Sequence, residues 1–209
     1  MTKMDDERFA AGIAILQYLS KAQTSTTPSL YFTAVKLFIS FQNLDDSSHY
    51  LFSLLACYHL STKLFENQVT LIGIRKKLSA GPFTKDFKNN FSKLGIIDLE
   101  NQFNTTYVSR SIERCELSII AALGFKFKKI NLEIDIINYI KLTLSWFIPN
   151  NSYKDSKYHD INNFSKYIHH ILSQVVFLPG IYFYDTKLVS ISLARLVLEH
   201  FMAPLDIFG

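Results

Sequence analysis

Apolar residues recur through the first half of the chain at intervals of three and four positions, which is the spacing of one face of an α-helix. In the segment from Asp6 to Lys21, this face carries Phe9, Ile13, Leu16 and Leu19. Short polar stretches interrupt the pattern and mark the breaks between helices. The pattern predicts an all-helical fold, with further helices over 28–42, 49–66, 69–78 and 107–123.

The segment from His49 to Glu66 differs from the others because it is apolar on nearly every face. Its apolar residues are Leu51, Phe52, Leu54, Leu55, Ala56, Cys57, Tyr58 and Leu60. A helix that is apolar all round is normally enclosed by other helices. We therefore expect the remaining helices of the first half to wrap around this one in a single layer.

A polar stretch from Ser79 to Thr106 is longer than an ordinary connection between helices, and it contains Gly81 and Pro82. We interpret it as a partly ordered insertion. The overlapping segment from Arg75 to Lys93 is strongly basic and holds a single acidic residue. We expect this basic segment to be a solvated loop.

Beyond Phe125 the helical pattern begins again. It predicts helices over 132–147, 160–176 and 186–202, separated by breaks rich in Asn, Ser, Pro and Gly. Three helices of this kind suggest a second unit like the first, but incomplete. The predicted domains are 6–128, with the insertion at about 79–106, and 129–209. The single tryptophan, Trp146, falls in an apolar helix of the second unit and is expected to pack.

Composition supports a folded chain and limits where it resides. Of the 209 residues, 48% are apolar and 19% are charged, which is far from the composition of disordered chains. The longest apolar runs, such as Leu54–Tyr58, are much shorter than the roughly 20 residues that span a bilayer. Residues Met1–Arg8 lack the apolar stretch of a secretory signal. We expect a protein of the nucleus or cytosol without a membrane span.

No motif for catalysis or metal binding stands out. Cys57 and His59 are two positions apart on one helix, and together with Cys115, His169 and His170 they form no recognisable ligand set. Both cysteines lie in apolar segments and are expected to be free and buried. Phosphate-binding glycine loops and nucleophile elbows are absent from the sequence. We expect no enzyme activity, no cofactor and no metal.

Several segments resemble helices of one family when taken in order. LLACYHLSTKLFE (Leu54–Glu66) resembles the third helix of the cyclin box, and CELSIIAALGF (Cys115–Phe125) resembles the fifth. FTAVKLFISFQ (Phe32–Gln42) is similar to the second helix, with Ser40 where many members carry Arg. Phe177–Phe201 is similar to the start of the third helix of the C-terminal box. The resemblance to cyclins covers residues 6–202 and is greatest to the transcription-associated types T, K, L and C.

The resemblance implies a fold of one five-helix cyclin box followed by a second, incomplete box. It also implies a regulatory subunit that binds and activates a cyclin-dependent protein kinase as a heterodimer, with the nucleus favoured as its location. In the family, a Lys at the end of the third helix and a Glu in the fifth hold the C helix of the kinase. These positions fall on Lys63 and Glu116. The apolar neighbours that match family contacts are Leu60, Leu64, Ile120 and Phe125.

Other interpretations stay open at this point. Taken singly, Lys63 would also suit the negative end of its own helix, and Glu116 would also suit a pair with Arg110 or Arg114. A cyclin-fold scaffold without a kinase is one alternative function. A transcription factor of the IIB type is another, but it predicts a zinc ribbon and more basic faces, so we expect no nucleic-acid partner.

The family's substrate-docking patch aligns with Gly12–Leu16. Ile13 replaces its Arg and Leu19 its Trp. We therefore expect Ile15 and Leu16 to be structural residues.

Overall fold

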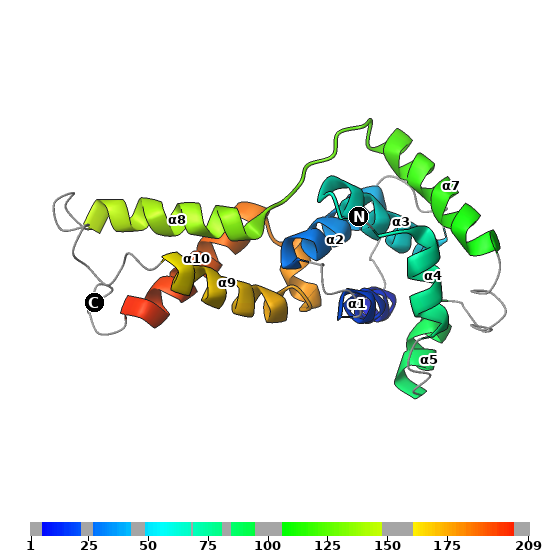
Figure 1. Ribbon diagram of the computed structural model, residues 1–209, viewed down its shortest axis with the longest axis horizontal. Helices are drawn as coiled ribbons and strands as arrows, with labels where there is room; N and C mark the ends of the chain where they lie inside the picture. The colour runs from blue at the N-terminus through cyan, green and yellow to red at the C-terminus, as the bar shows by residue number, and fades with distance from the viewer. Residues whose placement is uncertain are drawn as a thin grey trace. The chain divides into compact units, whose positions relative to one another are not determined.

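The structure is a computed structural model that describes residues 6–21, 27–42, 49–67, 69–80, 85–94, 106–147 and 161–202. Every regular element within these residues is helical, which confirms the predicted all-helical class. The chain divides into two compact units, residues 1–130 and 131–209 (Figure 1). This division lies two residues beyond the predicted boundary, and each unit is described below by itself.

The helices of the first unit follow the predicted order closely. They are α1 (Asp6–Lys21), α2 (Pro28–Gln42), α3 (Tyr50–Leu64), α4 (Leu71–Ser79), α5 (Lys85–Lys93) and α7 (Thr106–Ala122). The ends of α1 and α2 agree with the periodicity. Helix α5 lies inside the stretch predicted to be a partly ordered insertion, of which residues 81–84 and 95–105 lie outside the described residues.

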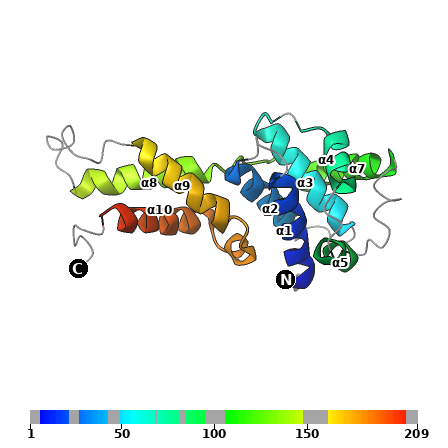
Figure 2. The same ribbon diagram turned by 60° about the horizontal axis from the view of Figure 1, so that its bottom comes forward.

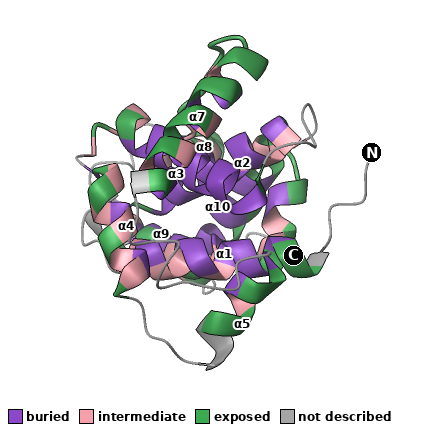
Figure 3. Ribbon diagram, turned by 90° about the vertical axis from the view of Figure 1, so that its right-hand side faces the viewer, coloured by how far each residue is buried: buried purple, intermediate pink, exposed green. Residues whose placement is uncertain are grey.

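Helix α3 lies at the centre of the first unit, as its all-round apolar surface predicts. Every residue from Tyr50 to Thr62 is buried, and α3 packs against α1, α2 and α7 (Figure 3). The Tyr50 ring meets Phe38 of α2 edge to face, with 4.8 Å between ring centroids. Burial of each large apolar side chain contributes about 1.5–3 kcal/mol, so this helix supplies much of the stability of the unit.

Helix α1 approaches α3 closely at Gly12. A Cβ atom at this position would lie 2.8 Å from Leu54 Cδ2 and 3.4 Å from Tyr50 Cε1. Two neighbours in α1, Ile15 and Leu16, are fully buried, so the segment aligned with a docking patch is part of the core, as expected.

Because of this contact, Gly12→Val should overpack the core and lower the free energy of unfolding by about 1–3 kcal/mol. The exposed Ala10 of the same helix provides a matched control. Ala10→Val should lower the free energy of unfolding by only about 0.5 kcal/mol, which is the difference in helix propensity between Ala and Val. Urea unfolding followed by circular dichroism measures both variants, and equal losses would contradict the close approach.

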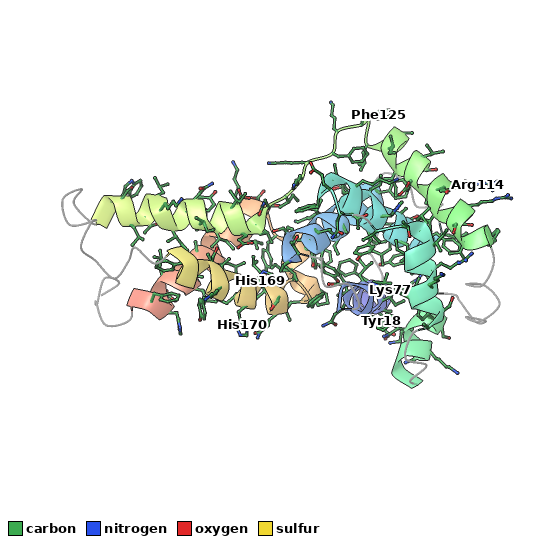
Figure 4. All side chains as sticks on the ribbon, in the orientation of Figure 1. Tyr18, Lys77, Arg114, Phe125, His169 and His170 are labelled. Atoms are coloured by element: carbon green, nitrogen blue, oxygen red, sulfur yellow. The ribbon has the colours of Figure 1, made fainter. Side chains whose placement is uncertain are left out.

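Among the described residues, the basic segment is helical over 75–79 and 85–93, so the prediction of a loop was wrong there. Arg75 and Lys77 lie in α4, which is capped by the Thr70 hydroxyl accepting from the Gly73 N–H at 3.0 Å. Helix α4 is tied to α1 because the Tyr18 hydroxyl donates to the Lys77 carbonyl at 3.3 Å (Figure 4). A helix of alternating apolar and basic residues can bury one face and solvate the other, which the charge count alone does not reveal.

The second unit contains α8 (Leu132–Phe147), α9 (Ile161–Val175), the 3-10 helix η2 (Pro179–Phe183) and α10 (Thr186–Met202) (Figure 2). Helix α8 packs against both α9 and α10. Tyr182 of η2 is buried and its hydroxyl donates to the Val176 carbonyl. None of the helices in the described ranges is long and apolar enough to span a membrane.

Trp146 does not pack as predicted, because its side chain is 77% exposed. The buried residues of α8 repeat every four positions at Leu132, Ile136, Ile140 and Leu144. Trp146 lies off this stripe, on the solvent side of the last turn. The apolar character of the whole segment masked this difference between faces.

Candidate functional site

Helices α3 and α7 pack together and bring the two predicted polar residues into contact. Lys63 lies in the last turn of α3, and its Nζ atom is 2.8 Å from Oε2 of Glu116 in the middle of α7. The two residues are 53 positions apart in the sequence. The two positions that were each predicted to contact a kinase therefore form an ion pair with each other.

Glu116 is a buried carboxylate, with only 8% of its side chain exposed. Its second oxygen, Oε1, is bound by Nδ1 of His59, which is also buried. His59 lies one helical turn before Lys63, so both residues reach α7 from the same face of α3. Buried carboxylates are stable only when both oxygens have partners, and here His59 and Lys63 supply them.

The environment of Glu116 favours its ionised form. Burial alone would raise the pKa of this carboxyl, but the hydrogen bonds and positive charge of His59 and Lys63 outweigh burial and lower the pKa below its ordinary value. Glu116 therefore carries a negative charge at neutral pH. Its charge balances Lys63 within the protein.

This geometry changes the expected role of Glu116. A side chain this buried, with both oxygens taken, does not reach a docked segment, whereas the Lys63 side chain is 55% exposed. Glu116 instead fixes the amino group of Lys63 at the surface. The alternative pairing of Glu116 with Arg110 or Arg114 is not found among the described contacts, and Arg114 is exposed on α7 (Figure 4).

The four predicted apolar residues differ widely in burial. Leu60 is buried, Leu64 and Ile120 are half-buried, and Phe125 is 78% exposed. Leu60 is therefore a core residue and does not present its side chain to a partner. Phe125 is the residue of this set that presents a large apolar surface to solvent.

Phe125 is held outward by an unusual backbone. Gly124 has φ +58° and Phe125 has φ +59°, so both residues lie in the left-handed region. The Phe125 N–H donates to the Ile120 carbonyl at 3.1 Å, which closes the end of α7. For a bulky residue this conformation costs about 1–2 kcal/mol, so the chain keeps an exposed ring at a position that would favour glycine or asparagine.

The sequence interpretation missed two residues of this site. Leu117 is 68% exposed and lies on the outer side of α7, one position after Glu116. His59 was missed because its contact depends on where α7 packs, and its only signal was the four-residue spacing to Lys63.

The described histidines and cysteines were considered as metal ligands. Within the described ranges, no group of three or more His, Cys, Asp or Glu side chains is placed to hold a metal ion. His169 and His170 are exposed on α9, and His170 Nε2 lies 3.2 Å from Gln174 Nε2. Neither Cys57 nor Cys115 forms a disulfide within the described residues; Cys57 is buried as expected, but Cys115 is only half-buried.

Comparison of the chain with protein-family models, curated proteins and solved structures found no match. The fold and the geometry of the site therefore carry the functional argument, together with the resemblance between segments of the sequence and the helices of the cyclin box.

Proposed function

We propose that this protein is a cyclin: a regulatory subunit, without catalysis of its own, that binds and activates a cyclin-dependent protein kinase, with a transcription-associated kinase favoured. The first unit would then be the N-terminal cyclin box and the second unit a partial box. We also propose a nuclear location, on the same resemblance.

The observation that carries the proposal is the exposed amino group of Lys63, fixed by a buried carboxylate on a neighbouring helix. Both residues occupy the positions that the resemblance assigns to kinase binding, and they meet at 2.8 Å although 53 residues separate them. Because the Lys63 side chain is largely exposed, it contributes little to stability. Lys63 is exposed enough to act on a partner, while Glu116 and His59 restrict where it can lie.

The proposed contact combines one fixed cation with an apolar anchor. Lys63 has two further N–H donors beyond the one directed at Glu116, and these suit carbonyl oxygens at the end of a docked helix. Leu117 and Phe125 offer exposed apolar surface of the kind that forms the core of an interface. Interfaces in which an aromatic anchor accompanies a desolvated charge tend to concentrate affinity in those few residues.

Activation would follow from binding one kinase conformation better than another. A docked cyclin would hold the kinase C helix inward, so that its Glu completes the ion pair with the Lys that positions ATP. On this proposal the protein supplies a shaped surface and the kinase supplies every catalytic group. The affinity difference between the two kinase conformations sets how far the equilibrium shifts.

The proposal is tested by affinity purification of the full chain from its own cells, followed by mass spectrometry. Wild type should recover a protein kinase, and Lys63→Ala should recover several-fold less. Lys63→Ala is preferred to a Glu116 variant because Glu116 is buried, so that its replacement would disturb folding. Recovery of no kinase would reject the proposal and favour a scaffold, and recovery of a kinase unaffected by Lys63→Ala would reject the interface.

A further inference from the structure

A second feature lies in the connection that follows α7. Residues Lys126–Lys129, here called the basic strip, carry three lysines and Phe127 in four positions. All three lysines are exposed, and the segment has no helical or turn structure. Lys126 and Lys128 are separated by Phe127 alone.

The basic strip is fixed to the first unit at its C-terminal end. Nζ of Lys129 lies 4.5 Å from the centroid of the Phe65 ring, just beyond the end of α3. The next residue, Ile130, donates its N–H to the Thr33 hydroxyl of α2 at 3.2 Å. Phe127 is half-buried. These contacts make the basic strip a defined surface of the unit.

The charge of the basic strip is not balanced within the described part of the chain. None of the ion pairs found there involves Lys126, Lys128 or Lys129. Three uncompensated positive charges over four residues attract an anionic partner and speed its association.

We propose that the basic strip binds an acidic peptide segment, in which carboxylates face Lys126 and Lys128. This inference goes beyond the proposed kinase interface and shares no residue with it. Charge complementarity at an exposed site of this kind selects the partner more than it tightens the complex.

The described contacts favour a peptide over single-stranded nucleic acid. Nucleic-acid surfaces of this type offer several free aromatic faces on which successive bases stack. Here the Phe65 ring lies against Lys129 and Phe127 is half-buried, so Phe125, which precedes Lys126, is the single largely exposed ring of these three. One ring does not provide the row of aromatic faces on which successive bases stack. Carboxylates need only the lysine amino groups, which remain open to solvent.

Fluorescence anisotropy with the full chain tests the inference. The probe is a labelled decapeptide of alternating Glu and Ala, beside the matched Gln–Ala peptide and a ten-base oligo-dT. In low salt, Lys126→Gln/Lys128→Gln should bind the Glu peptide about five- to tenfold more weakly than wild type. Lys126→Arg/Lys128→Arg, which keeps the charge, should bind as wild type does.

The control Lys166→Gln/Lys187→Gln removes two exposed lysines of the second unit. It should leave affinity unchanged, and circular dichroism should show all variants folded because every replaced side chain is exposed. The inference is overturned if the Gln–Ala peptide binds the wild-type protein as tightly as the Glu–Ala peptide does. It is also overturned if Lys126→Gln/Lys128→Gln and Lys166→Gln/Lys187→Gln lose the same affinity, or if oligo-dT binds and the Glu–Ala peptide does not. In the last case the strip would be a nucleic-acid surface.

Discussion

Phe125→Asn is expected to lose about 30-fold or more in affinity for the proposed kinase, while the free energy of unfolding stays the same or rises. An aromatic anchor at the centre of an interface typically contributes about 2 kcal/mol or more, which corresponds to this loss. The ring is 78% exposed, so its removal costs little packing in the free protein. Asparagine also tolerates the left-handed backbone at φ +59° better than phenylalanine does.

Two controls separate an anchor from a general effect of surface hydrophobicity. Phe125→Tyr keeps the ring and should bind within about threefold of wild type. Trp146→Gln removes an equally exposed ring in the second unit and should leave kinase recovery unchanged. A Phe125→Asn variant that binds as well as wild type would show that the exposed ring has no part in the interface.

The second large effect concerns folding. Glu116→Ala is expected to lower the free energy of unfolding at pH 7 by about 3 kcal/mol or more, because it leaves the buried His59 without its partner. Lys63→Ala should cost about 1 kcal/mol or less, because the lysine is largely exposed. Urea unfolding of the two variants measures this asymmetry, and equal costs would contradict the burial of Glu116.

The same carboxylate gives the stability a pH dependence of defined sign. The pKa of Glu116 is lower in the folded chain than in the unfolded one. The contribution of Glu116 to the free energy of unfolding is therefore complete above its pKa in the unfolded chain, about 4.3. This contribution is lost as the pH falls through its pKa in the folded chain.

Between pH 5 and pH 3, wild type should lose the stability that ionised Glu116 contributes, and Glu116→Gln should not show this loss. Glu113→Gln, which replaces an exposed residue of the same helix, should show it as wild type does. Denaturation midpoints at pH 7, 5, 4 and 3 provide the comparison. If the denaturation midpoints of wild type and Glu116→Gln fell equally with pH, the pairing of Glu116 with His59 and Lys63 would be contradicted.

Helix positions followed from the sequence wherever one apolar face alternates with a polar one. The ends of α1 and α10 coincide with the predicted ends for this reason. The sequence did not predict α5, because its polar surface resembles a loop. It also misplaced Trp146, since an apolar helix does not reveal which of its faces is covered.

The candidate site was only partly predictable. The resemblance indicated Lys63 and Glu116, but their contact depends on the packing of α7 against α3, which no local pattern contains. The same packing brings in His59 and buries Glu116. The resemblance therefore indicated Lys63 and Glu116 but not which of them is exposed to a partner. The outward position of Phe125 arises from two consecutive left-handed residues, which only the backbone reveals.

The proposal that this protein binds and activates a protein kinase is tested most directly by the phosphotransfer activity that purifies with it. The full chain, recovered from its own cells, is incubated with γ-labelled ATP and a general protein substrate, in parallel with Phe125→Asn. If the protein is a cyclin that binds through Phe125, wild type should carry kinase activity. Phe125→Asn should carry at least tenfold less at equal recovery of the folded chain. Activity at background level with wild type, or the same activity with both proteins, would contradict this proposal.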